Sequence, residues 1–243
     1  MIFFRQVFSV LRLFFARERA NLQPLAFNGV ILPVVLSYLG SRLAISPAQF
    51  RLWLGGCVTL ALGLNAVNQI GFYVLCDRFQ HGLALLNTTL VTKPVYYVAL
   101  LIMAIIESAL LISTSMALFA LIGISLHFSS LALGAVAAVC GSAMLSGIGI
   151  LVALKVPDFD TGSSTIGGLA LGLALVSPLF YSVNSLPTAF RVLVFLSPFT
   201  FVAPLVRAVV DGGSAPAWAI AGSIAIAIGL NAVCFRAVPW NVD

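Results

Sequence analysis

Residues 94–124 read PVYYVALLIMAIIESALLISTSMALFALIGI and contain a single charged side chain, Glu107. A helix of this length is long enough to cross the hydrocarbon core of a bilayer, which is about 30 Å thick. The rest of the chain has the same character, because 61% of its 243 residues are apolar and only 8% are charged. Soluble domains carry about 25% charged residues. We therefore expect an all-α integral membrane protein.

Apolar stretches on either side of this segment predict six transmembrane helices in total. Their expected bounds are 22–40, 52–75, 94–124, 131–154, 166–183 and 215–235. We interpret residues 1–243 as one membrane domain and expect no soluble catalytic domain of about 100 residues within it. The net charge of +5 is explained by basic residues beside the spans, so no nucleic-acid partner is expected.

Residues 1–20 predict an amphipathic helix that lies in the membrane interface ahead of the first span. One helical stripe is polar or small and a neighbouring stripe is apolar: Arg5, Ser9, Arg12, Ala16 and Arg19 against Phe4, Phe8, Leu11 and Phe15. Such a helix directs arginines to lipid phosphates and aromatic rings to the acyl boundary. The alternative is an irregular first span, for which several arginines within the hydrocarbon are costly.

The distribution of basic residues predicts the orientation, because cytoplasmic loops are enriched in Lys and Arg. With the amino terminus inside, eight of the 12 basic residues fall on the cytoplasmic side: Arg5, Arg12, Arg17, Arg19, Arg78, Lys93, Lys155 and Arg236. Four fall outside: Arg42, Arg51, Arg191 and Arg207. We therefore expect a multi-pass protein of a bacterial plasma or inner membrane with both termini in the cytoplasm.

Residues 184–213, between the fifth and sixth spans, are apolar but broken by Pro187, Pro198 and Pro204. Such a segment is too interrupted for one straight span and too apolar for a free loop. We expect two short half-helices that re-enter the outer leaflet, which requires protein or a water-filled cavity around them. The alternative is an external loop that contains an amphipathic segment.

No catalytic or metal-binding pattern is present. The sequence has no P-loop, no paired cysteine motif and no Ser/His arrangement, so we expect no enzymatic activity, no metal and no cofactor bound by this chain. Glu107 lies within a span, where a carboxyl group should face protein or water. Glu107, Asn65 and Asn68 are therefore candidates for a polar cavity, with helix–helix hydrogen bonding as the alternative.

Two segments resemble the permease subunits of type-2 ABC exporters. Residues 77–95 (DRFQHGLALLNTTLVTKPV) resemble the segment that couples such permeases to their ATPase, with matches at Asp77, Arg78, Gly82, Leu83 and Leu86. Residues 186–207 (LPTAFRVLVFLSPFTFVAPLVR) resemble the outer re-entrant gate, with matches at Leu186, Pro187, Ser197, Pro198, Pro204 and Arg207. The order of these segments after an amphipathic first helix is also similar to the family.

This resemblance implies a half-transporter. Two permease copies, identical or different, would pair in the membrane, and two ABC ATPase subunits would bind ATP and Mg²⁺ below them. Residues 76–93 would form the coupling segment, and 184–213 the gate. The expected substrate is an amphipathic or hydrophobic molecule, drug-like or lipid-like. Two alternatives are open: a polysaccharide or glycolipid exporter of the same plan, and a passive channel or structural membrane protein without an ATPase.

Overall fold

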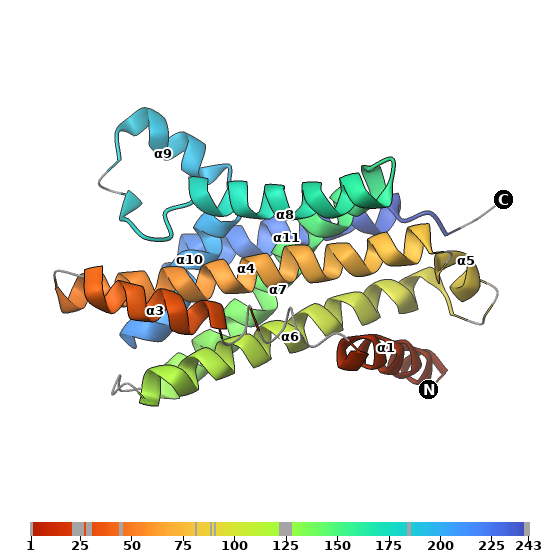
Figure 1. The fold of residues 1–243 in the computed structure, drawn as a ribbon, viewed down its shortest axis with the longest axis horizontal. Coiled ribbons are helices and arrows are strands. Elements are labelled where there is room, and N and C mark those ends of the chain that lie inside the picture. Colours follow the sequence, from red (N-terminus) through yellow and green to blue (C-terminus); the bar gives the residue numbers. More distant parts are fainter. Residues whose placement is uncertain are drawn as a thin grey trace.

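The computed structural model describes residues 2–20, 27, 31–43, 46–80, 82–87, 89, 91–121, 128–183 and 186–240. All regular structure within these residues is helical, which confirms the expected all-α character for this part of the chain (Figure 1). The elements in chain order are α1 (Ile2–Ala20), α3 (Leu32–Leu43), α4 (Pro47–Phe79), α5 (Gly82–Asn87), α6 (Lys93–Leu121), α7 (Phe128–Lys155), α8 (Phe159–Val176), α9 (Thr188–Phe195), α10 (Phe199–Asp211) and α11 (Ala217–Ala237).

The long helix α4 is the centre of the bundle and contacts α3, α6, α7, α8 and α10. Its most extensive contact is with α7, and glycines make this contact close. A Cβ atom at Gly149 would lie 2.1 Å from the carbonyl oxygen of Val67, and one at Gly71 would lie 3.0 Å from Gly149 Cα. Small residues of this kind let transmembrane helices gain packing energy from backbone contact.

Five described helices are long and apolar enough to cross a membrane: Pro47–Phe79, Lys93–Leu121, Ala132–Lys155, Phe159–Val176 and Ala217–Ala237. The pair α9–α10 becomes a sixth crossing only if its two helices, which meet at 90°, form one broken span. The expected first span, 22–40, is described at residue 27 and from residue 31 onward, where α3 begins at Leu32. The six-span count therefore stays a prediction.

Two expected span boundaries are wrong because local caps start the helices earlier. Helix α4 begins at Pro47 rather than 52, since the Ser46 hydroxyl oxygen accepts a hydrogen bond from the Gln49 N–H at 3.2 Å. Helix α8 begins at Phe159 rather than 166, since Asp158 accepts one from the Thr161 N–H at 2.8 Å. Helix α8 also ends at Val176, before the expected residue 183.

The described part of the expected gate forms two short helices. Helix α9 lies at the edge of the molecule, whereas α10 packs among α4, α7 and α11 (Figure 1). Residues 184 and 185 lie outside the described part of the chain. Two short helices at 90° agree with the expected half-helix geometry, and their depth in a membrane stays a prediction.

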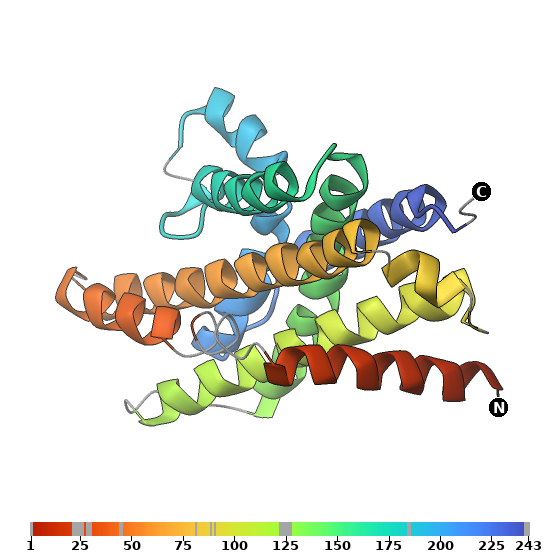
Figure 2. The same cartoon turned by 45° about the vertical axis from the view of Figure 1, so that its right-hand side comes forward.

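Helix α1 runs alongside α6 at the end of the bundle that also holds α5 and both chain ends (Figures 1 and 2). We call this the α5 end. The side of α1 that packs inward is lined by Val7, Val10, Leu11 and Phe14. Phe4 and Phe8 are exposed, as is Arg12, which stacks on the Phe8 ring at 4.6 Å. An amphipathic helix is therefore present, and its position in a membrane interface stays a prediction.

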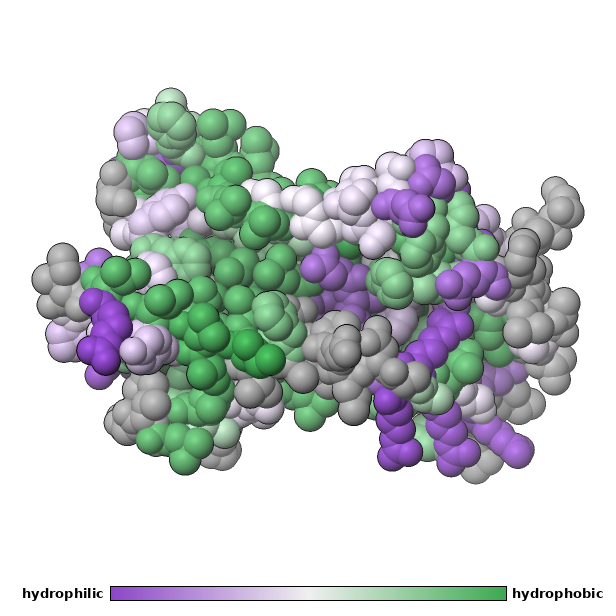
Figure 3. Space-filling view, viewed as in Figure 1, coloured by the Kyte–Doolittle hydropathy of each residue, from purple (hydrophilic) through white to green (hydrophobic). Residues whose placement is uncertain are grey.

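The 12 basic residues separate along the bundle as their sequence positions suggested. The eight assigned to the cytoplasm lie on α1 and at the ends of α4, α6, α7 and α11 that point toward the α5 end, and the other four lie toward the opposite end. In the space-filling view, hydrophilic side chains gather at the α5 end and apolar ones cover much of the remainder (Figure 3).

Candidate functional site

Asp77 ties three helices together at the α5 end. It lies in the last turn of α4, where its side chain is 1% exposed. One carboxylate oxygen is 2.7 Å from Arg17 Nη1 of α1, and the other accepts a hydrogen bond from the Tyr96 hydroxyl of α6 at 2.8 Å. The sequence analysis placed Asp77 in the loop after the span, but α4 continues to Phe79, and a role of Asp77 in coupling stays a prediction.

Arg78 lies beside Asp77 in the same last turn of α4 and also points into the bundle. Its guanidinium donates hydrogen bonds to the carbonyl oxygens of Ala153 at 2.9 Å and Val156 at 2.7 Å. These carbonyls belong to the carboxyl end of α7, where a cation is favoured by unpaired carbonyls and by the helix dipole. Arg78 is thus outside the expected loop as well, and it joins α4 to α7.

The predicted coupling segment, 76–93, contains one short described helix, α5. Gly82 at its start rests on Asp77, because a Cβ atom there would lie 2.6 Å from Asp77 Oδ1 and 3.0 Å from Asp77 Cα. Leu83 and Leu86 are buried in the core of this chain. The five residues assigned to coupling therefore lie together, and all five make contacts within the protein. Residues 81, 88 and 90 lie outside the described chain.

Glu107 and Asn65 form a buried pair between α6 and α4. Asn65 Nδ2 donates a hydrogen bond to Glu107 Oε2 at 3.1 Å, and both residues are at most 2% exposed. The sequence did not predict this pairing, because Asn65 is expected nearer the cytoplasmic end of its span than Glu107 is in its own. Asn68, the third predicted cavity residue, lies three residues further along α4. It does not join this pair, and it lines the cavity between α1, α4 and α8 that is described below.

A second buried carboxyl group was missed by the sequence analysis. Glu18 of α1 is 6% exposed and accepts a short hydrogen bond from Gln69 Nε2, which also lies 3.3 Å from the Tyr73 hydroxyl. Burial raises the pKa of Glu18 and the Gln69 hydrogen bond lowers it, with burial the larger effect. A signal was available, since Val7, Leu11, Phe14 and Glu18 are spaced four, three and four residues apart on one helical stripe.

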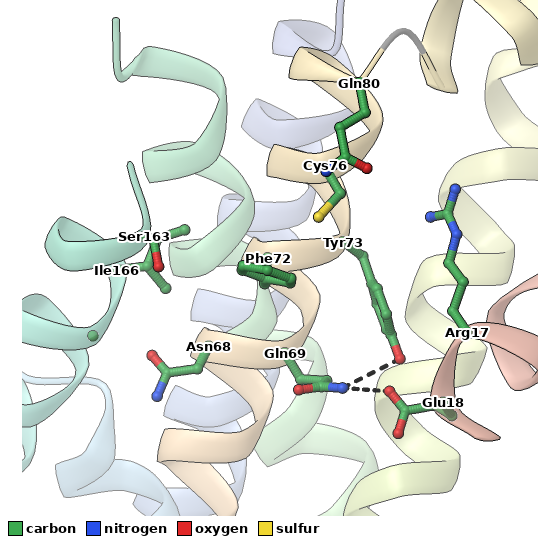
Figure 4. A pocket seen from close by; sticks show the side chains of 11 residues that line it. Arg17, Glu18, Asn68, Gln69, Phe72, Tyr73, Cys76, Gln80, Ser163 and Ile166 are labelled. Atoms are coloured by element: carbon green, nitrogen blue, oxygen red, sulfur yellow. Dashed lines mark hydrogen bonds between the residues drawn. The ribbon is translucent and has the colours of Figure 1, made fainter. Parts of the chain in front are cut away.

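Glu18 lies at the wall of a cavity of about 530 Å³ between α1, α4 and α8 (Figure 4). Side chains of mixed character line this cavity. The polar ones are Arg17, Glu18, Asn68, Gln69, Gln80 and Ser163, and the remainder are Phe72, Tyr73, Cys76, Ile166 and Gly167. A hydrophilic patch over α4 interrupts the apolar face in the same region of the bundle (Figure 3). Of the three predicted cavity residues, only Asn68 is among the lining.

Two of the six residues assigned to the gate, Ser197 and Arg207, connect α10 and the residue before its cap to the end of α8 and the segment that follows it. The Ser197 hydroxyl lies 2.6 Å from that of Ser177 and donates to the Leu173 carbonyl oxygen at 3.0 Å. Arg207 Nη2 donates to the carbonyl oxygens of Pro178 and of Leu179, the latter at 3.0 Å. Pro178 and Leu179 follow directly after the end of α8. The hydrogen bonds of Ser197 and Arg207 therefore hold α10 against the connection between α8 and α9.

Of the other gate residues, Leu186 accepts a hydrogen bond at its carbonyl oxygen from Arg191 Nε at 2.9 Å. Leu186 is partly exposed and Pro187 is exposed, where it begins α9. Pro198 begins α10, and Pro204 lies inside that helix. A proline in a helix interior removes one backbone hydrogen bond, which favours bending of α10 at this point.

These features, a helical membrane bundle with an amphipathic first helix and a short helix docked on its end, agree with one known family. Residues 12–210 match the sequence model of the family described as ABC-2 type transporter. The chain belongs to the ABC-2 type transporter family.

The protein is thus the membrane subunit, or permease, of an ABC transporter, and membership of this family implies an ABC ATPase as its partner. The match covers α3 to α9 completely, together with the part of α1 that contains Arg17 and Glu18. No individually curated protein matches the sequence at a significant level.

Proposed function

We propose that this permease exports an amphipathic or hydrophobic molecule, drug-like or lipid-like, from the cytoplasm or the inner leaflet. Two permease copies, identical or different, would pair with two ATPase subunits, which bind ATP and Mg²⁺. A bacterial plasma membrane with both termini in the cytoplasm is the proposed location. The eight basic residues at the α5 end support this orientation.

One observation supports the proposal most strongly: Asp77 contacts both the wall of the cavity and α5, the proposed coupling helix. Arg17 lines the cavity and pairs with Asp77 at 2.7 Å, and Asp77 in turn supports Gly82 of α5. A push on α5 from an ATPase would reach Asp77 directly, because no side chain separates Gly82 from it. Asp77 would then carry the movement to α6 through Tyr96 and to α1, which lines the cavity, through Arg17.

The lining of the cavity supports an amphipathic substrate. Phe72, Tyr73 and Ile166 offer apolar contact, while Asn68 and Gln69 offer carboxamide groups. Ligand sites are commonly apolar surfaces that carry a few polar groups for orientation. A lipid-like or drug-like molecule with one polar end therefore fits this arrangement.

A glycan substrate has less support. A polysaccharide path would favour aromatic rings along one channel, yet the rings near the expected gate pack into separate groups. Phe180 packs on Trp53 with ring centroids 4.7 Å apart, and Phe195, Phe201 and Trp218 form a cluster with centroids 5.7 to 6.0 Å apart. These contacts fix helices against one another.

The test is transport in inside-out membrane vesicles that contain the permease and the ATPase that co-purifies with it. Ethidium represents a drug-like substrate, and fluorescent phosphatidylethanolamine represents a lipid-like one. We expect ATP-dependent accumulation or translocation of one of them, abolished when the Walker lysine of the ATPase is replaced. Absence of a co-purifying ATPase, or ATP-independent movement in both cases, would contradict the proposal and favour a passive protein.

A further inference from the structure

We propose that Glu18 makes the cavity selective for organic cations, so that the permease takes amphipathic molecules with a positively charged head group. This inference rests on the proposed function for its biological meaning, while the binding site itself stands on the geometry alone. Three features of the cavity support it: the charge of the lining, the incomplete hydrogen bonding of Glu18, and the aromatic rings of the lining.

The described lining residues carry a net negative charge when the ion pair between Arg17 and Asp77 is counted as neutral. Only Arg17 and Glu18 are charged among them. Arg17 is neutralised by Asp77 at 2.7 Å, a residue that does not itself line the cavity. Glu18 has no cationic partner among the described residues, so its carboxyl group sets the electrostatic preference of this space.

The hydrogen bonding of Glu18 is incomplete. Its Oε1 atom accepts from Gln69, but Oε2 is buried and has no hydrogen-bond partner within the described part of the chain. A buried carboxylate oxygen without a partner is costly in a membrane protein. A cationic head group or its N–H donors would supply the missing interaction, and a negatively charged ligand would make the cost larger.

Two aromatic rings line the cavity that contains this carboxyl group: Tyr73 lies near Glu18, and Phe72 lies further away, on the side of α8 (Figure 4). Glu18 points toward Gln69 and Tyr73 (Figure 4). The Phe72 ring is 36% exposed, and ring faces attract organic cations. A cavity lined by one carboxylate and by aromatic rings is a combination that binds ammonium or phosphonium groups with apolar substituents.

The experiment compares two ions of nearly the same shape and opposite charge, tetraphenylphosphonium and tetraphenylborate. Equilibrium binding of each is measured with the purified permease–ATPase complex in detergent, without ATP. Three proteins are compared: the parent, Glu18→Gln and Glu107→Gln. Glu107→Gln is the matched control, because it makes the same change at a buried carboxyl group that does not line the cavity.

We expect the parent to bind tetraphenylphosphonium more tightly than tetraphenylborate. Glu18→Gln should weaken phosphonium binding about tenfold, the change expected when one ionic attraction at a partly buried site is lost, without weakening borate binding. Glu107→Gln should keep the parent affinity for both ions. Size-exclusion chromatography of each complex verifies that assembly is retained.

Unchanged phosphonium affinity in an assembled Glu18→Gln complex would overturn the inference. An equal loss in Glu107→Gln would also overturn it, because the effect would then not belong to the cavity. The outcome is distinguishable from failure of the proposed function, since this assay contains no ATP. Charge-selective binding that depends on Glu18 would stand even if the vesicles show no ATP-driven transport.

Discussion

The hydrogen bond between Asn65 and Glu107 joins α4 to α6 where neither side chain reaches solvent. Neither residue lines the cavity at the α5 end. A carboxyl group that faces a carboxamide from the neighbouring helix avoids the cost of exposure to lipid. We therefore interpret Glu107 as a residue that holds two core helices in register, rather than one that contacts substrate.

Substitutions at Glu107 test this interpretation. Glu107→Leu leaves the Asn65 carboxamide buried without its partner, so we expect the complex to lose roughly 1–3 kcal/mol of stability. Glu107→Gln keeps an acceptor for Asn65 and should keep both assembly and transport. Thermal unfolding of the purified complex measures the first effect. An assembled Glu107→Gln complex without transport would show instead that this group contacts substrate or an ion.

The burial of a charged residue could be predicted from the sequence where that residue is the only charge in an apolar stretch. Glu107 is such a case, whereas Glu18 stands next to Arg17 and Arg19 and looked like part of a polar surface. Its burial depends on α1 packing against α4 and α6, which composition does not reveal. Asp77 and Arg78 were found as a pair, but their inward contacts depend on the extension of α4 to Phe79.

At the scale of elements, the contact between α5 and the end of α4 leaves no room for a side chain at position 82. Gly82→Ala would place a Cβ atom 2.6 Å from Asp77 Oδ1 and 3.0 Å from its Cα. Such overpacking typically costs about 1–3 kcal/mol. We expect reduced ATPase co-purification and reduced transport, because α5 would shift on its support.

The control for Gly82 is a glycine in open space. Gly229 of α11 has no atom within 4 Å of an added Cβ, so Gly229→Ala should change stability by less than about 1 kcal/mol, in the stabilising direction expected from helix propensity. Pull-down of the ATPase compares the two variants. Equal ATPase recovery and transport for Gly82→Ala and the parent would remove α5 from the coupling path.

The pair α9–α10 can be tested by its access to water. Val192 and Leu193 of α9 are exposed in the structure and apolar, so burial in lipid should protect cysteines placed there from an impermeant thiol reagent. Ser214, an exposed residue after α10, provides the control that should react rapidly. The four native cysteines are first replaced. Fast labelling at all three positions would indicate an external loop.

Helix boundaries show where hydropathy stops being informative. The expected span 94–124 nearly coincides with the described α6, because Lys93 and Pro94 mark the amino-terminal end of the helix. The amino-terminal ends of α4 and α8 were placed too late, since Ser46 and Asp158 extend each helix into polar sequence. The half-helices α9 and α10 were predictable because prolines interrupt an apolar stretch.

At the scale of the whole molecule, the helices divide into a packed centre and an outer layer. The most apolar windows of α4, α6 and α7 are 61–67% buried, whereas those of α8 and α11 are 22% buried. The outer helices therefore present apolar faces to their surroundings, which are lipid or the proposed second permease. The sequence predicted the class of the protein from composition, but not which helices form this centre.

The central claim is that an occupied cavity is linked to the ATPase through Arg17, Asp77 and α5. The most direct test measures ATP hydrolysis by the reconstituted complex with and without the compound, ethidium or labelled lipid, that ATP drives in the vesicles. Arg17→Gln removes the charge that joins the cavity wall to Asp77. The account predicts that this complex assembles and keeps its basal hydrolysis but loses most of the stimulation by the compound. Full stimulation in an assembled Arg17→Gln complex would contradict it.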